Sequence, residues 1–318
     1  MAAKKLQRVQ IPADDTRDFG LGSKITQQTR TRFLNKDGSF NVERKGQSFL
    51  RSLSPYHALL SVSWTKFYAM VVVAYFAVNT FFGCAYLLCG PEALQGSTGS
   101  TLVGRVFDAF FFSVQTLATI GYGKMSPNGL APNIIVAFEA LTGLFGFALA
   151  TGLLFARFSR PNAQIQYSEQ AVIAPYRGIT GFMFRIINER KNQLIEVNAT
   201  VTFSRMETID GYSSRRFYPL PLERQKVVFF PLNWTIVHPI DEQSPLYGVT
   251  QQDLENSDAE FSILLTAIDE TFSQTVHSRS SYKFEEVVVG ARFKDMFVPS
   301  TDGVTRIDVR RLSEIEKV

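Results

Sequence analysis

Five consecutive residues near the middle of the chain could bind a cation through their backbone. The stretch 119–123 reads Thr-Ile-Gly-Tyr-Gly and lies between two long apolar segments. Pointing successive carbonyl oxygens the same way requires backbone angles that residues with a Cβ resist, and Gly121 and Gly123 lack a Cβ. Carbonyl oxygens aligned in this way can replace the water around a dehydrating cation. The hydroxyl of Thr119 could add one ligand at the end of the array.

The stretch resembles the selectivity-filter loop of potassium channels, in which four copies of the loop surround one axis. The resemblance implies that K⁺ is bound by Thr119, Ile120, Gly121 and Tyr122, and that Gly123 completes the ion-binding loop. The side chains of Ile120 and Tyr122 would pack outward and brace the ring. A Gly-Tyr-Gly turn on a soluble loop is the alternative, because short tripeptides occur by chance. The membrane-length segments on both sides favour the filter.

Two apolar segments, residues 64–89 and 133–158, flank this loop. Each exceeds the approximately 20 residues needed to cross the hydrocarbon core of a bilayer. Residues 107–117 are too few for a third span and are predicted to form a re-entrant helix that returns as the filter loop. Non-helical backbone at that depth is tolerated where it is buried in protein and lines a pore. The sequence therefore predicts a pore domain over residues 64–160.

The second span carries small residues and one acid. Gly143 permits close helix packing and could also act as a hinge, and packing alone would explain most glycines of this span. Glu139 is the one acid inside either span. Because a carboxyl group is costly in lipid, Glu139 is expected to face the protein interior behind the filter. A structural hydrogen-bonding role is favoured over ion coordination.

The N-terminal part is polar and basic. Residues 1–46 lack sustained periodicity, and much of this arm is expected to be disordered or loosely draped. Residues 47–63 predict an amphipathic slide helix in the membrane interface, with a linker helix on a soluble domain as the alternative. The basic residues before and just after the apolar block place both termini in the cytoplasm. The N-terminus shows no pattern of a signal peptide.

Lys66, Arg157 and Arg160 are expected to form a basic collar at the cytoplasmic leaflet. Such a collar suits anionic lipid headgroups. Ordinary positive-inside topology could also account for these charges entirely.

Residues 161–318 alternate short β-branched and aromatic runs with turn signals, a pattern typical of an all-β sandwich. A nucleotide-binding motif is absent from the sequence, and His57, His238 and His277 have no nucleophile or metal-ligand spacing around them. Neither span carries a ladder of arginines, so a voltage sensor is not indicated. We expect an α+β membrane protein that is not an enzyme and has neither a cofactor nor a nucleic-acid partner.

Two spans around one filter, followed by a β-rich domain, resemble the inward-rectifier potassium channels, and most closely their bacterial branch, KirBac. The resemblance runs from about residue 36 to residue 312. Beyond the filter, it rests on Ala-Arg-Phe-Ser-Arg-Pro at 156–161, Gln-Leu-Ile-Glu at 193–196, Trp-Thr-Ile-Val-His-Pro-Ile-Asp-Glu at 234–242, Ser-Pro-Leu-Tyr at 244–247 and Arg-Ser-Ser-Tyr at 279–282.

The family resemblance implies a homotetramer that conducts K⁺, with an immunoglobulin-like cytoplasmic sandwich extending the pore. It places a gate at Phe155, where four phenylalanines would close the helix bundle, with Gly143 above it. It also implies that Arg157 and Arg160 look like the phosphoinositide contacts of eukaryotic relatives, although the sign of a lipid effect does not carry over. The residues implied to line the cytoplasmic pore are Glu196, Phe272, Gln274 and His277.

The sequence departs from the family pattern at several positions. Phe147 stands where strongly rectifying relatives place an acid, and Lys294 replaces a vestibule acid, so weak rectification is expected. Gln115 and Met125 replace a salt bridge behind the filter. The extracellular disulfide of eukaryotic members is missing, which favours a prokaryotic cell membrane. Two alternatives stay open: a less selective cation channel, and a membrane-anchored sandwich that serves as a binding or scaffold module.

Overall fold

The computed structural model of the protein describes residues 32–42, 55–159, 163–190, 192–209, 212–230, 232–299 and 304–318. The chain divides into two compact units. The first, which we call the pore domain, covers residues 45–160. The second, the C-terminal domain, combines residues 1–44 with 161–318. The two units are described separately.

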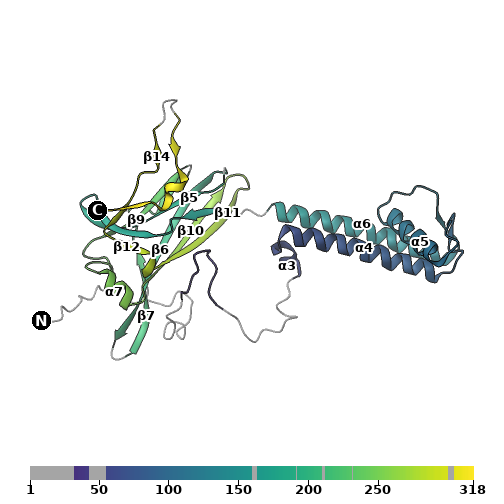
Figure 1. Ribbon diagram of the computed structural model, residues 1–318, viewed down its shortest axis with the longest axis horizontal. Coiled ribbons are helices and arrows are strands. Elements are labelled where there is room, and N and C mark those ends of the chain that lie inside the picture. Colours follow the sequence, from purple (N-terminus) through teal and green to yellow (C-terminus); the bar gives the residue numbers. More distant parts are fainter. Residues whose placement is uncertain are drawn as a thin grey trace. The chain divides into compact units, whose positions relative to one another are not determined.

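The pore domain is built from helices. They are α3 (Pro55–Ser61), α4 (Trp64–Leu88), α5 (Leu102–Leu117) and α6 (Leu130–Phe158), with a two-stranded ribbon of β1 (Leu94–Gln95) and β2 (Ser126–Pro127). By length and composition, α4 and α6 can each cross a membrane. They lie side by side, with α5 beside one end of the pair and α3 beside the other (Figure 1). The expected arrangement of two long helices around a shorter one is present.

Two helices begin earlier than predicted. The short helix begins at Leu102 rather than at Phe107, because Thr101 caps it by accepting a hydrogen bond from Gly104 N (3.1 Å). The residues around Thr101 are rich in Gly, Ser and Thr, a composition typical of loops, so the sequence did not indicate a helix N-cap at Thr101. Helix α6 begins at Leu130 rather than at residue 133. Its first turn accommodates Pro132, since the first N–H groups of a helix have no partner within it. Of the predicted slide helix, residues 55–61 are helical and 47–54 lie outside the described residues.

The C-terminal domain contains two five-stranded sheets. The first has the order β11-β10-β6-β7 with β8 also paired to β6, and its strands are β6 (Leu194–Ile209), β7 (Tyr212–Leu220), β8 (Lys226–Phe229), β10 (Glu260–Asp269) and β11 (Gln274–Lys283). The second has the order β12-β4-β5-β3 with β9 paired to β5, and its strands are β3 (Ile165–Tyr167), β4 (Ala171–Tyr176), β5 (Ile179–Asn188), β9 (Asn233–Ile240) and β12 (Val287–Val289). The pairing of β12 with β4 is parallel.

Shorter elements complete the domain. They are α7 (Gln251–Asn256), the 3₁₀ helices η1 (Phe284–Glu286) and η2 (Val309–Ser313), and the ribbons β13 (Ala291–Phe293) with β16 (Ile315–Lys317) and β14 (Phe297–Val298) with β15 (Arg306–Ile307).

Aromatic side chains from both sheets form the core of this domain. Phe261 of β10 stacks on Phe182 of β5 with ring centroids 4.2 Å apart, and on Phe203 of β6 at 4.9 Å. All three rings are buried. Sheets that pack face to face through such alternating inward residues form a sandwich. The predicted all-β sandwich is confirmed.

The described part of the N-terminal arm, residues 32–42, is hydrogen-bonded to β10, β11 and η1 of its domain rather than loosely draped. The backbone N–H groups of Phe33 and Leu34 each donate to the carboxylate of Glu260 (3.1 Å). Arg32 donates to the carbonyl oxygen of Ser281 (2.6 Å) and pairs with Glu286 (3.0 Å). Composition alone could not reveal this, because the partners lie more than 200 residues further along the chain. Residues 1–31 and 43–46 lie outside the described residues.

Candidate functional site

The loop after α5 has an alternating backbone conformation. Thr119, Gly121 and Gly123 have positive φ angles of 56°, 59° and 78°, whereas Ile120 and Tyr122 do not. Alternation between left- and right-handed angles turns successive peptide groups so that their carbonyl oxygens can share one direction. The left-handed angle at Thr119 is uncommon for a residue with a β-branched side chain and marks a constrained position. Glycine positions predicted this conformation at 121 and 123, but no sequence signal identified it at 119.

The loop is anchored through N–H groups, and its carbonyl oxygens accept no hydrogen bond from a described residue. Thr119 N donates to Thr116 O (3.1 Å), and Ile120 N donates to Gln115 O (2.8 Å). Both acceptors belong to the last turn of α5. Within the part of the chain that the structure describes, no donor bonds to a carbonyl oxygen of residues 119–123. Carbonyl groups that no described donor binds are available as ligands for a dehydrated monovalent cation.

A polar cluster lies between α5 and the two spans. Glu139 of α6 is fully buried, and the hydroxyl groups of Tyr86 and Ser113 both donate to its carboxyl group. Ser113 Oγ is also 3.1 Å from Oδ1 of Asn79. The cluster joins α4, α5 and α6, so it fixes α5 relative to both spans. The expected interior, hydrogen-bonding role of Glu139 is confirmed. Its partners were not predicted from sequence. Asn79, a polar residue in the middle of a span, was the one signal that could have indicated a polar cluster there.

Glycines let the spans approach α5 closely. A Cβ at Gly143 of α6 would lie 2.4 Å from the carbonyl oxygen of Leu117, the last residue of α5. A Cβ at Gly83 of α4 would lie 3.3 Å from Cα of Phe110. Close packing therefore accounts for the glycine at 143, and its role as a hinge stays a prediction. Phe155, near the end of α6, is 72% exposed in the single chain.

The predicted basic collar does not form one surface. Arg157 is only 9% exposed, and its guanidinium donates to the carbonyl oxygens of Leu59 and Val62 (2.7 Å to Val62). It also lies over the rings of Trp64 and Phe67, at 4.5 Å and 4.6 Å from their centroids. The expectation of a lipid-facing Arg157 is corrected: its side chain holds the C-terminal end of α3 against α6.

The other two members of the predicted collar differ from Arg157. Lys66 is exposed on the first turn of α4, as the collar requires. Arg160 lies outside the described residues.

The structure brings the four predicted cytoplasmic-pore residues to one sheet of the C-terminal domain. Gln274 begins β11 opposite Asp269, and Phe272 lies in the turn between β10 and β11. Glu196 is on β6, beside the residue that pairs with Ile268 of β10. Its carboxylate forms an ion pair with Lys226 (2.9 Å), which sequence reasoning missed.

The fourth of these residues, His277, is exposed further along β11, where its Nδ1 lies 3.3 Å from Thr266 Oγ1. All four residues are solvent-exposed in the single chain.

Two spans packed against a short helix, which is followed by a loop whose carbonyl groups have no described donor, define the pore-forming unit of a cation channel. Residues 68–160 match the family model described as "Ion channel", and residues 165–318 match that of the inward rectifier potassium channel C-terminal domain.

The chain is 41% identical over 288 residues to the inward rectifier potassium channel Kirbac3.1 of Paramagnetospirillum magnetotacticum, covering 90% of this chain and 96% of the relative. It is 28% identical over 305 residues to the ATP-sensitive inward rectifier potassium channel 12 of Bos taurus and of Mus musculus, covering 87% of this chain and 70% of each relative. Among solved structures, the sporulation control protein Spo0M of Bacillus subtilis matches at 7% identity with a TM-score of 0.23, over 43% of this chain and 59% of that one, a likeness that carries no argument.

The chain therefore belongs to the inward-rectifier potassium channel family, in its bacterial branch. Its relatives are integral membrane ion channels and not enzymes.

Proposed function

We propose that the protein conducts K⁺ passively across a prokaryotic cell membrane, with both termini in the cytoplasm. The observation that supports this most directly is the loop of residues 119–123, whose carbonyl oxygens have no donor within the described chain. Thr119, Ile120, Gly121 and Tyr122 would supply the K⁺ ligands, and Gly123 would complete the ion-binding loop. K⁺ is the transported ion and no cofactor takes part.

The unit that conducts is a homotetramer. One loop offers carbonyl oxygens from one side only, whereas a dehydrated ion must be surrounded by them. In the single chain Ile120 and Tyr122 are 46% and 77% exposed, and Phe147 of α6 is 75% exposed. Apolar surface of this extent within a pore domain is explained by contact with lipid and with other copies around a symmetry axis.

The gate lies below the filter at Phe155. Four phenylalanine side chains at the same height would close the pore by steric contact and dewetting. Because Gly143 lies against the end of α5, bending of α6 would be easiest below it, where a Cβ at Gly146 or Gly152 meets no atom within 4 Å. The C-terminal domain would contribute a second constriction near Phe272.

Anionic lipids modulate this channel, and rectification is weak. The exposed Lys66 is available to lipid headgroups, whereas Arg157 acts by holding α3 against α6. Phosphoinositide-like headgroups are one class of such lipids. Weak rectification follows from the apolar Phe147 and from the ion pair of Glu196 with Lys226, which leaves less negative charge to hold Mg²⁺ or polyamines.

Flux of K⁺ and of Na⁺ into liposomes tests this function. The purified protein should pass K⁺ far faster than Na⁺, and Gly121→Ala should abolish K⁺ flux. Gly178→Ala is a matched control, since both glycines have positive φ and open space around a Cβ but Gly178 lies in the turn between β4 and β5 of the C-terminal domain. Equal permeability to K⁺ and Na⁺ would identify a less selective cation channel instead. Unchanged flux in Gly121→Ala would exclude conduction through this loop.

A further inference from the structure

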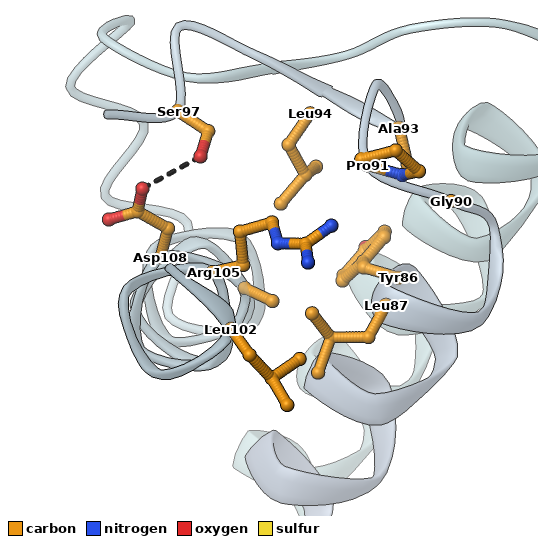
Figure 2. A pocket seen from close by; sticks show the side chains of 11 residues that line it. Tyr86, Leu87, Gly90, Pro91, Ala93, Leu94, Ser97, Leu102, Arg105 and Asp108 are labelled. Carbon is orange, nitrogen blue, oxygen red and sulfur yellow. Dashed lines mark hydrogen bonds between the residues drawn. The ribbon is translucent and has the colours of Figure 1, made fainter. Parts of the chain in front are cut away.

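A pocket of about 100 Å³ lies at the end of the pore domain that carries the filter loop. Its walls come from the last turn of α4, the loop that follows it and the first half of α5. Arg105 of α5 points its guanidinium into this space, between Tyr86, Leu87 and Leu94 (Figure 2).

The guanidinium of Arg105 has no protein partner in the described chain. Its Nε atom is buried without a hydrogen bond, and no hydrogen bond or ion pair connects the rest of the group to a described residue. A cation partly withdrawn from water is costly unless an anion or several acceptors satisfy it. Nε of Arg157 in the same domain is likewise buried without a hydrogen bond, but the other two nitrogens of that guanidinium donate to carbonyl oxygens and the group lies over two aromatic rings, whereas Arg105 has no such contact in the described chain.

The nearest acid on the helix is already engaged elsewhere. Asp108, one turn after Arg105, accepts hydrogen bonds from Ser97 Oγ (2.8 Å) and from the N–H groups of Thr98 and Gly99 (both 2.9 Å). Figure 2 shows its carboxylate turned toward Ser97 rather than toward Arg105. Three donors therefore offset the charge of Asp108, and the pocket keeps the positive charge of Arg105.

The remaining walls are mostly apolar. Leu87, Leu94 and Leu102 line the pocket, and Leu102 at its edge is 66% exposed. A planar guanidinium binds two oxygens of a phosphate at once, and apolar walls suit an anion that carries hydrocarbon. The pocket lies at the end of α4 opposite to α3. With the topology of the proposed function, on which this step rests, it faces the headgroup region of the outer leaflet.

We propose that Arg105 binds the phosphate group of an anionic phospholipid of the outer leaflet. The guanidinium would contact the phosphate oxygens, and the glycerol and first methylene groups would lie over the leucines of the pocket. This site is separate from the exposed Lys66, which lies on the first turn of α4, at the other end of that helix.

The test measures phosphatidylglycerol retained by the purified full-length protein in detergent, over a range of lipid concentrations. Arg105→Gln should raise the Kd about tenfold to a hundredfold, as expected for hydrogen bonds between charged groups. The Kd of Arg105→Lys should lie between those of wild type and Arg105→Gln, because an ammonium group keeps the charge but cannot donate two parallel hydrogen bonds to one phosphate. Leu102→Trp keeps the charge and obstructs the pocket, so it should also weaken binding and serves if Arg105→Gln fails to fold. Lys124→Gln, an exposed cation just after the filter, is the matched control and should bind as wild type does.

A second arm uses inorganic phosphate in place of lipid. Competition between phosphate and phosphatidylglycerol at the wild-type site would support phosphate recognition with the lipid as its source. Arg105-dependent binding of phosphate without binding of the lipid would overturn the lipid assignment. Equal retention of phosphatidylglycerol by wild type and by Leu102→Trp and Arg105→Gln would overturn the site. The site would also be overturned if the Arg105 variants changed only the stability of the tetramer, because that result would indicate that Arg105 pairs with a carboxylate of a neighbouring copy. None of these readouts is K⁺ flux, so this site and the proposed conduction can fail separately.

Discussion

The two domains each bury a carboxyl group, and they satisfy it differently. In the pore domain, Glu139 is bound by the neutral hydroxyl groups of Tyr86 and Ser113. In the C-terminal domain, Asp258 pairs with Arg215 and with Lys283 (3.0 Å to Lys283), and both it and Arg215 are less than 10% exposed.

Neutral partners alone do not distinguish the domains, because the buried Glu260 of the C-terminal domain is bound by the N–H groups of Phe33 and Leu34. The difference lies in the charged partners of Asp258, which Glu139 lacks in the described chain, and it reflects the surroundings of each domain. Helices in lipid form their backbone hydrogen bonds internally, and a neutral partner for a buried acid avoids the cost of placing a second charge in the membrane interior. A sandwich in water can bring long basic side chains from its surface to a buried acid.

The largest effect is expected at Asp258. Asp258→Ala removes the carboxylate shared by the buried Arg215 and the half-buried Lys283, and it should lower the free energy of unfolding by about 3–5 kcal/mol. Thermal or denaturant unfolding of the full-length protein measures this. The matched control is Glu223→Ala, which breaks the exposed pair of Arg177 and Glu223 (2.6 Å) and should cost less than about 1 kcal/mol. Similar losses for the two variants would show that burial does not distinguish these ion pairs.

A smaller effect is expected at Glu139. Glu139→Ala leaves the hydroxyl groups of Tyr86 and Ser113 without their buried acceptor, which costs about 1–3 kcal/mol. Glu139→Gln keeps an oxygen acceptor and should cost less. The temperature at which the detergent-solubilised assembly dissociates and unfolds reports both. Glu139→Ala with wild-type stability would mean that the cluster does not hold α5 between the spans.

The comparison extends to a cation of the pore domain, since the described hydrogen-bond partners of Arg157 are also neutral groups, the carbonyl oxygens of Leu59 and Val62. Arg157→Lys and Arg157→Gln should both change K⁺ flux in liposomes about fivefold or more, because neither side chain can span the carbonyl oxygens of Leu59 and Val62. Lys66→Gln removes an exposed cation, and its effect should follow the anionic lipid content. Wild-type flux in Arg157→Lys, with loss only in Arg157→Gln, would instead indicate that the charge matters through lipid.

The smallest effect is expected at His238, a buried histidine of the C-terminal domain, and concerns the pH dependence of stability. Burial lowers the pKa of His238, whose ring nitrogens contact Pro221 O (2.6 Å) and Ser244 Oγ (2.8 Å). Once the pH falls below about 6.5, the unfolded chain takes up a proton that the folded ring resists. This contribution to stability is therefore present above that pH and lost progressively below it.

Unfolding midpoints of the full-length protein, measured between about pH 7.5 and about pH 5, test the role of His238. This range extends roughly one unit or more to either side of the usual histidine pKa. His238→Gln should be less stable at neutral pH but less sensitive to acid. An unchanged pH slope in this variant would assign the acid sensitivity to other groups.

Much of the architecture could be predicted from sequence because its signals are local. Hydropathy located both spans, and alternation of short β-branched runs located the sandwich. The start of α5 was missed because a threonine cap inside a Gly/Ser/Thr-rich stretch resembles loop composition. The docked arm was missed because Glu260, its main anchor, lies far along the chain and has no pattern that pairs it with Phe33 and Leu34.

For the filter loop, the positions of Gly121 and Gly123 could be interpreted from sequence alone, because glycine lacks a Cβ and the left-handed angles there need only local chemistry. Only the tertiary structure decided that Thr119 also adopts a left-handed angle, because α5 constrains the backbone at the start of the loop. Likewise, only the structure turned Arg157 into the protein while Arg105 faces a pocket. Both are long basic side chains at helix ends, and what satisfies each depends on elements that folding brings beside it.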